Sequence, residues 1–420
     1  MIAIGGTIGS GIFLTPALVA QQLPSPVWIL FVWGLGGIIT LAGSLTFAEL
    51  GGMMPKAGGM YVYLSEAYSP LAGFLFGWAY FLVVNTGGLA GVCIAFATYL
   101  GHFIPLSQLQ IQCVAVAGLI FVTILNVMGV KIGGIFSDLF TLLKIAGIAI
   151  LIVVGLGWGT GSAGVEGGPL VSVSGGALAA AMIGVLWSYG GWQHASFAAG
   201  EARNPTRSVP RAMMFGAAAV TVVYSLANVA YLFMLSPGEL GASQRPASDA
   251  ISLILGPIGG SIVAVAIFVS TFGSAGIYTL TAPRIYFAMA NDGLFFKKVA
   301  EVHPRFQTPA LAIILQTCWA IALILFWGTF NEVISYVVFT DWIFFGLTGA
   351  AVFVLRKRRP DIDRPYRTFG YPLTPLLFVG ISCWFVVNTL IDQPAQAFAG
   401  LGFLALGVPV YYYWKNKRRS

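Results

Sequence analysis

The fold is decided by Gly5-Gly6-Thr7-Ile8-Gly9-Ser10-Gly11-Ile12-Phe13, a stretch in the middle of the first apolar segment. Four glycines and a serine fall within seven residues there, and a glycine costs roughly 1 kcal/mol in a helix interior. We therefore expect the helix to be interrupted. Because free backbone groups find no partners in lipid, an interrupted turn inside a membrane must face a cavity that holds water or a ligand. The alternative is a glycine-rich helix that packs closely on a neighbour.

The two helix ends at such an interruption carry opposite partial charges. The helix that resumes at Ile12 would point free N–H groups and its positive dipole end into the cavity, which suits a carboxylate. The carbonyl groups that end the preceding half-helix suit a cation such as an ammonium group. One broken turn could therefore hold both charged ends of an amino acid.

The composition is that of a membrane protein. Of 420 residues, 58% are hydrophobic and 8% are charged, whereas a soluble domain has about 25% charged residues. Long apolar runs indicate a polytopic helical protein, because a β-barrel would show short alternating segments. No cleavable signal peptide is visible, since the first segment is broken by glycines and has no basic region before it. The cysteines fall in apolar segments and indicate buried side chains, not disulfides or a metal site: Cys93, Cys113, Cys318 and Cys383.

The net charge of +7 comes from basic residues at alternate segment ends, which is the positive-inside pattern. It predicts that both termini lie in the cytoplasm and argues against a nucleic-acid partner. Only Lys144 and Arg245 fall outside the pattern.

About twelve spanning helices fit the chain, at roughly 20 apolar residues each. We expect them near residues 1–20, 27–50, 70–99, 109–128, 135–156, 176–199, 209–235, 258–289, 309–327, 333–355, 372–391 and 394–414. Residues 157–174 and 236–255 would be external loops, and residues 201–208 an internal one.

A second interruption lies near the centre of the sixth expected helix, at Trp187-Ser188-Tyr189-Gly190-Gly191-Trp192. The first and sixth helices start on opposite sides of the membrane. Interrupted helices at matching places in two inverted halves are the best sequence pointer to a transporter binding site. We expect a single membrane domain over residues 1–420, with residues 1–157 and 176–355 as inverted repeats and residues 372–414 appended. The symmetry is one of topology only.

Motifs spread over nearly the whole chain resemble the amino acid–polyamine–organocation (APC) superfamily, and most closely its L-type amino acid transporter (LAT) branch. In chain order the matching stretches are Gly6 to Phe13, Ala48-Glu49-Leu50-Gly51, Lys56-Ala57-Gly58-Gly59, Tyr189-Gly190-Gly191-Trp192, Glu201-Ala202-Arg203-Asn204-Pro205, Phe272-Gly273-Ser274, Arg284, His303-Pro304, Thr308-Pro309 and Arg364-Pro365-Tyr366. Each is weak alone, but their order and spacing together are specific.

The resemblance implies an all-α, LeuT-like 5+5 inverted-repeat fold and alternating-access transport of amino acids. It implies that backbone N–H groups of Gly9 to Gly11 and the Ser10 hydroxyl bind the carboxylate. Carbonyl groups of the two breaks would receive the α-ammonium. The substrate-binding residues would be Thr7, Ile8, Gly9, Ser10, Gly11, Trp187, Ser188 and Gly190. Trp187 occupies the family's aromatic lid position; its alternative role is core packing.

Lys144 lies about ten residues into the fifth expected helix, roughly 15 Å deep. An amine near the bilayer midplane is costly and is a functional candidate; the alternative is snorkelling to the interface. The family places a lysine here beside the first break, where sodium-coupled relatives bind Na⁺. Lys144 would then replace the ion, which argues against sodium coupling, and a lowered pKa could also let it carry a proton.

Other polar residues carry weaker signals. Glu49, Lys56, Glu201 and Arg203 resemble an internal gate network, with surface solvation as the alternative. Four residues could line the cavity, although packing is favoured for them: Asn85, Tyr278, Thr340 and Asp341. Packing is also favoured for His194. The sequence shows no metal-ligand cluster, no nucleophile triad and no nucleotide loop, so we expect no cofactor and no enzymatic activity.

The resemblance also bears on partners. Eukaryotic L-type relatives pair with a single-span glycoprotein through a cysteine between the third and fourth helices. Residues 101–108 contain no cysteine, so we expect no disulfide-linked heavy chain and favour a prokaryotic source. The family also has a longer cytoplasmic segment before the first break, which helps to close the inner gate.

We therefore expect a transporter of small or medium neutral L-amino acids in the cytoplasmic membrane, by exchange or proton-linked uptake. One alternative is a transporter of cationic amino acids or amines. Such a protein would want an acidic side chain in the pocket, and none is evident near either break. Another is a membrane sensor that binds an amino acid without moving it.

Overall fold

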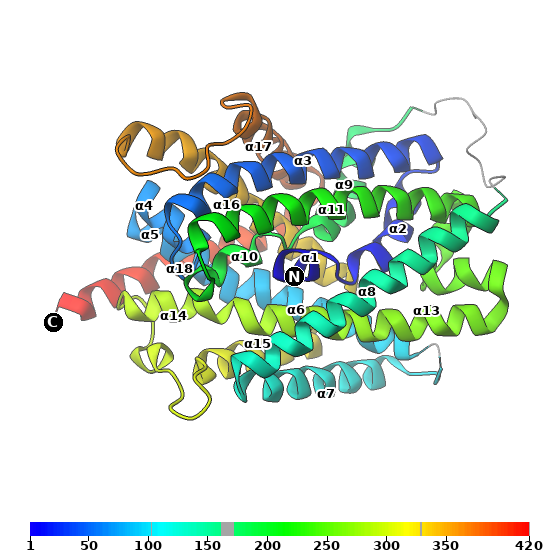
Figure 1. Ribbon diagram of the computed structural model, residues 1–420, viewed down its shortest axis with the longest axis horizontal. Helices are drawn as coiled ribbons and strands as arrows, with labels where there is room; N and C mark the ends of the chain where they lie inside the picture. The colour runs from blue at the N-terminus through cyan, green and yellow to red at the C-terminus, as the bar shows by residue number, and fades with distance from the viewer. Residues whose placement is uncertain (102, 161–171, 328–329, 420) are drawn as a thin grey trace.

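The computed structural model describes residues 1–101, 103–160, 172–327 and 330–419, and all regular elements there are helices. Figure 1 shows them as one elongated bundle. The elements are α1 (Ile2–Thr7), α2 (Gly11–Gln22), α3 (Pro26–Met53), α4 (Met60–Ala67), α5 (Pro70–Ala79), η1 (Tyr80–Val84), α6 (Asn85–Leu100), α7 (Gln108–Val127), α8 (Val130–Trp158), α9 (Gly175–Tyr189), α10 (His194–Phe197), η2 (Ala199–Glu201), α11 (Pro205–Met234), α12 (Pro237–Ala242), α13 (Pro246–Thr281), α14 (Pro283–Asn291), η3 (Lys297–Ala300), α15 (Ala310–Trp327), α16 (Phe330–Arg358), α17 (Leu373–Asp392) and α18 (Pro394–Arg419).

The described helices confirm a polytopic membrane fold. Nine spans in the described residues are long and apolar enough to cross a membrane. The two interrupted pairs α1–α2 and α9–α10, together with the 18-residue α15, account for the other three expected spans. The inverted relation of residues 1–157 and 176–355 stays a prediction.

The observed helix ends follow local capping chemistry. Ser107 caps α7 by accepting the N–H of Gln110, whose side chain accepts the N–H of Ser107 in return. Ser174 caps α9 in the simpler way, by accepting from the backbone of Ala177. Such caps satisfy N–H groups that have no partner within the helix.

The prediction that residues 236–255 form an external loop was wrong. The short helix α12 occupies part of this stretch, and α13 already begins at Pro246. Gly256 has a positive φ of 69° and Pro257 follows it, so α13 is kinked there. Because both residues are typical helix breakers, the turn before them resembled a loop in the sequence.

Two further features were not expected. The helix α4 lies in the connection between the second and third spans. The third span contains the π-helical turn η1 between α5 and α6. Such turns widen a helix locally and are frequent at functional sites.

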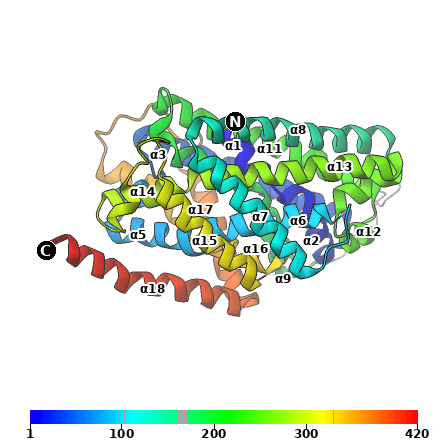
Figure 2. The ribbon, with the colours of Figure 1, turned by 90° about the horizontal axis from the view of Figure 1, so that it is seen from below.

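The interrupted helices lie at the centre of the bundle. α11 packs along α3, α13 packs along α8, and α2 packs against α9. Figure 1 shows α1 and the N-terminus near the middle of the molecule, between α11 and α13. Figure 2 shows α18 along an outer edge. The fold thus surrounds both breaks with long helices.

Candidate functional site

The first break confirms the predicted interruption. α1 ends at Thr7 and α2 starts at Gly11. Ile8 between them is extended, with φ −71° and ψ 92°. Ser10 precedes α2 as its N-cap, but its side chain makes no capping hydrogen bond. The helix axis is therefore broken where the glycines gather, and the Ser10 side chain does not cap the start of α2.

The second predicted interruption is confirmed as well. α9 ends at Tyr189 and the short helix α10 begins at His194. Gly190 is extended. Gly191 has φ +119°, a conformation that side-chain-bearing residues rarely adopt. The glycine pair therefore makes this turn possible.

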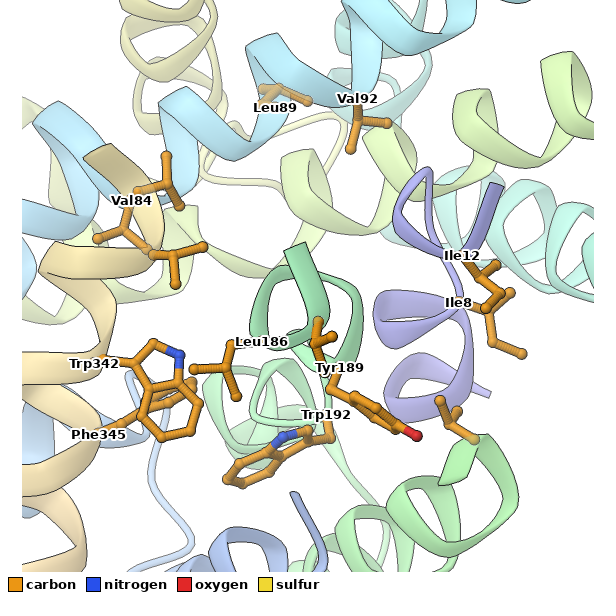
Figure 3. Packing of buried hydrophobic residues seen from close by; sticks show 14 of the residues in the cluster. Ile8, Ile12, Val84, Leu89, Val92, Leu186, Tyr189, Trp192, Trp342 and Phe345 are labelled. Atoms are coloured by element: carbon orange, nitrogen blue, oxygen red, sulfur yellow. The ribbon is translucent and has the colours of Figure 1, made fainter. Parts of the chain in front are cut away.

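The two breaks touch each other through glycine backbones. A Cβ atom on Gly6 would lie 2.9 Å from the carbonyl oxygen of Gly191, and a Cβ on Gly191 would overlap the carbonyl oxygen of Gly6. A Cβ on Gly11 would lie 2.6 Å from the Cα of Ser188. Figure 3 shows the segment with Ile8 and Ile12 beside the turn with Tyr189 and Trp192. Close packing was the alternative explanation for the glycines of the first break. The structure shows both the close packing and the interruption of the helix.

Lys144 connects the first break to α8 and α13. Its side chain is buried, and Nζ donates to the carbonyl oxygens of Gly5 and Ile8, both at 2.7 Å, and to the Ser274 hydroxyl at 2.8 Å. The ammonium group therefore uses all three of its hydrogens. It lies at the carbonyl end of α1, where the helix dipole favours a cation. This geometry differs from snorkelling, the alternative for this residue.

The Ser10 hydroxyl is different. It is buried and has no hydrogen-bond partner among the described residues. Buried polar groups are almost always paired, with protein or with bound water or ligand. Ser10 lies at the N-terminus of α2, so its hydroxyl is available to a ligand that also approaches the free N–H groups of that helix.

Some of the other groups predicted to bind the substrate already have hydrogen-bond partners within the protein. The Tyr224 hydroxyl donates to the carbonyl oxygen of Thr7 at 2.9 Å. The carbonyl oxygen of Trp187 accepts from the N–H of Gly190 at 3.1 Å. The Ser188 hydroxyl lies 2.6 Å from that of Thr15. Sequence reasoning missed Tyr224, because nothing marks one tyrosine of 16 as the partner of a distant carbonyl.

A small cavity lies beside the second break. Its walls include Trp187 and Gly190 from the break, Asn85 on α6, Tyr278 on α13 and Asp341 on α16. Its free volume is about 30 Å³, enough for one or two water molecules but not for an amino acid. The surrounding side chains must therefore move apart to admit a larger ligand. The described residues of the first break, Thr7 to Gly11, do not line this cavity.

Polar side chains for which packing was expected line the same cavity. His194 stacks on Tyr278, with ring centroids 4.7 Å apart. The Asn85 amide nitrogen donates to Gln316 at 2.9 Å. Thr340 is buried too, but its hydroxyl lies toward Gly400 on α18.

The four gate candidates do not form one network. Glu49 is buried and accepts from Arg356 at 2.7 and 2.9 Å, and from the N–H and hydroxyl of Thr368 at 2.7 and 2.8 Å. Glu201 pairs instead with Arg284 at 2.9 Å. Lys56 and Arg203 make no ion pair within the described part of the chain. The arginines Arg356 and Arg284 were missed, because an ion pair between distant segments leaves no local pattern.

The described residues include no group of three His, Cys, Asp or Glu side chains that could hold a metal ion. The chemistry of the two breaks is therefore that of peptide groups, hydroxyls and one ammonium. Such groups can bind and orient a zwitterion.

Comparison with known proteins agrees with this geometry. Residues 1–411 match the family model described as amino acid permease. The chain is 34% identical over 422 residues to the serine/threonine exchanger SteT of Bacillus subtilis, covering 100% of this chain and 96% of the relative. It is 32% identical to the human b(0,+)-type amino acid transporter 1 and to the human large neutral amino acids transporter small subunit 2, covering 99% of this chain in both cases and 88% and 79% of the relatives. The chain therefore belongs to the amino acid permease family of the APC superfamily and is a multi-pass amino acid transporter.

Proposed function

We propose that this transporter exchanges small or medium neutral L-amino acids across the cytoplasmic membrane, independently of Na⁺ and by alternating access. Both termini would lie in the cytoplasm. The observation that carries the proposal is the pair of facing breaks with the buried, unpartnered Ser10 hydroxyl between helix ends of opposite polarity.

The carboxylate would bind at the start of α2, through the N–H groups of Gly9 to Gly11 and the Ser10 hydroxyl, which has no partner among the described residues. The α-ammonium would bind carbonyl oxygens of Thr7, Trp187, Ser188 and Gly190. In the described structure Thr7 already accepts from Tyr224 and Ile8 from Lys144. The carbonyl oxygen of Trp187 accepts from the N–H of Gly190, so the oxygens of Ser188 and Gly190 are the better candidates for the ammonium in this conformation.

Independence from Na⁺ rests on Lys144. Carbonyl oxygens and a serine hydroxyl are the ligand types that a hard cation prefers. The ammonium group of Lys144 binds three of them, from Gly5, Ile8 and Ser274. A sodium ion would have to compete with a covalently attached cation for the same oxygens, so we expect Lys144 to take its place.

The names of the relatives support neutral substrates and exchange. One is named a serine/threonine exchanger and another a large neutral amino acids transporter. Proton-linked uptake stays an alternative, since Lys144 is a buried amine. Transport of cationic amino acids or amines also stays an alternative, because Asp341 lines the cavity beside the second break.

We further propose that the chain works without a disulfide-linked heavy chain, although one relative is named a small subunit. The cysteines lie within α6, α7, α15 and α17, and the connection from α6 to α7 has none in its sequence. The expectation that all four are buried was wrong, because Cys93 is buried but Cys113, Cys318 and Cys383 are exposed. We also propose that it transports rather than senses and that it is not an enzyme.

Counterflow into liposomes that contain the purified protein tests the proposal. Labelled serine or alanine should accumulate only when unlabelled amino acid is inside, and replacing Na⁺ by choline should leave the rate unchanged. Binding without exchange would favour a sensor. A rate that depends on Na⁺ would contradict the role given to Lys144.

A further inference from the structure

Two buried hydrogen-bond acceptors beside the second break have no donor among the described residues. The Oδ1 atoms of Asp341 and Asn85 are both buried and have no partner among the described residues. The amide hydrogens of Asn85 are directed to Gln316 instead. Buried acceptors without donors are rare in folded proteins and indicate an absent water, ion or ligand.

The charge of the Asp341 carboxyl group is also unmatched. No lysine or arginine is among the residues that line the cavity. The nearby His194 can complete the hydrogen bonds of both its ring nitrogens as a neutral ring. Because the Thr281 hydroxyl donates to the carbonyl oxygen of Ile277, it must accept from Nδ1 of His194.

The second nitrogen of the His194 ring faces the Tyr80 hydroxyl at 3.4 Å and can accept from it. With Nδ1 as donor and Nε2 as acceptor, the neutral ring is complete and has no hydrogen left for Asp341. The Oδ1 atom of Asp341, which has no partner among the described residues, is therefore free to accept from a ligand in the cavity.

The position of Asp341 fits the side chain of a bound amino acid. The cavity is lined on one wall by Trp187 and Gly190, whose carbonyl groups are proposed to hold the ammonium group. Asp341 lies on α16, together with Trp342 and Phe345 of the same wall. Figure 3 shows Trp342 and Phe345 across from Leu186 near the second break. A substrate held at the breaks can thus direct its side chain toward α16.

We propose that Asp341 determines specificity by accepting a hydrogen bond from the substrate side chain, so that hydroxyl- or ammonium-bearing amino acids are preferred over aliphatic ones of the same size. The inference rests on the proposed function, because it needs the backbone of the amino acid at the two breaks. The expectation from the sequence, that no acidic side chain lies near either break, was wrong. Asp341 is distant in sequence and reaches the second break only through the packing of α16.

The test compares threonine with valine, which have the same shape but differ in one donor. Wild-type protein, Asp341→Leu and Asp341→Asn are placed in liposomes, and labelled alanine reports exchange because it lacks a side-chain donor. The concentrations of threonine, valine and 2,4-diaminobutyrate that halve alanine exchange are measured for each. Asp138→Leu, which removes an exposed carboxyl group on α8, is the matched control.

In the wild type and in Asp138→Leu, threonine or diaminobutyrate should compete at roughly tenfold lower concentration than valine, the scale of a hydrogen bond to a charged group. Asp341→Leu should remove this preference. Asp341→Asn keeps an oxygen acceptor without the charge, so it should retain a preference for threonine and lose any for diaminobutyrate. The stronger competitor in the wild type identifies hydroxyl or ammonium as the preferred donor.

Equal ratios of threonine to valine in the wild type and in Asp341→Leu would overturn the inference. If Asp341→Leu exchanges no alanine, the purified Asp341→Asn and wild-type proteins are compared by thermal-shift titration with diaminobutyrate and with valine. If the ratio of the two half-saturating concentrations is the same in both proteins, the inference is overturned. Absence of alanine exchange by the wild type would instead count against the proposed function.

Discussion

The two breaks are built alike but held differently. At the first break, the carbonyl groups of α1 and α2 accept hydrogen bonds from remote elements. Lys144 on α8 binds Gly5 and Ile8, Tyr224 on α11 binds Thr7, and Tyr231, also on α11, binds Ile12. At the second break, the hydrogen bonds of the described backbone N–H groups stay within a few residues, from Gly190 to Trp187 and from Gly191 to the Gln193 side chain, and only side chains such as Ser188 reach remote residues.

This difference separates two tasks. The backbone of the first break is held by α8 and α11, so it suits the coupling of substrate binding to movement of those helices. The backbone of the second break is held by its own residues, so it suits a recognition surface. Changes in remote residues should therefore affect the first break more than the second.

Replacement of Lys144 should have the largest effect. In Lys144→Ala the carbonyl groups of Gly5 and Ile8 lose their donor inside the membrane, at about 1–3 kcal/mol each. We expect exchange to fall on the order of a hundredfold while the protein still folds, because the long helices around it are unchanged. Counterflow measures the first and size-exclusion chromatography the second. Wild-type exchange would refute the assignment of Lys144 to the first break.

Gly191→Ala should be the most damaging change within the second break. The positive φ and the overlap with Gly6 both oppose a methyl group, and such strain costs on the order of 1–3 kcal/mol. Gly380→Ala is the control, because that glycine is in the interior of α17 with open space around it. Thermal unfolding in detergent should show a clear loss for Gly191→Ala alone. Equal stability of the two variants would mean that the breaks are not in contact.

The sequence predicted these two regions unequally well. Both interruptions are visible in the sequence, because glycine pairs act on their own turn and need no remote partner. Lys144 is visible because a charge in an apolar segment is unusual. Tyr224 is not visible in this way, and Asp341 stood only among several residues that could line the cavity, since a tyrosine or a single carboxyl group acquires its role only when a distant helix packs beside it.

The same reasoning explains the errors at the charged ends of the helices. Glu49 and Glu201 were identified as charged residues at helix ends, and both are in ion pairs. Their partners Arg356 and Arg284 are 307 and 83 residues away. Sequence spacing has no information about pairs at such distances. The two glutamates were therefore grouped with Lys56 and Arg203, the basic residues that lie close to them in the sequence.

Ser10→Ala separates binding from stability at the first break. Because the hydroxyl has no partner among the described residues, its removal should leave thermal stability unchanged. A bound carboxylate would lose one donor, so the half-saturating substrate concentration should rise about tenfold. Ser270→Ala, which removes another buried hydroxyl without a described partner, should change neither. A large loss of stability in Ser10→Ala would show that the hydroxyl has a structural role instead.

A bulky residue at the same position, such as in Ser10→Leu, should abolish uptake.

Tyr224→Phe should give the smallest effect and the sharpest test of the comparison. It removes one hydrogen bond to the carbonyl oxygen of Thr7, worth about 1 kcal/mol, so exchange should change about fivefold. Tyr189→Phe is the matched control, because its hydroxyl is buried at the second break but donates to Trp33 at 3.1 Å, away from the turn. If remote residues hold only the first break, Tyr224→Phe alters the exchange rate and Tyr189→Phe does not. The reverse result would mean that the second break, and not the first, senses the movement of its neighbours.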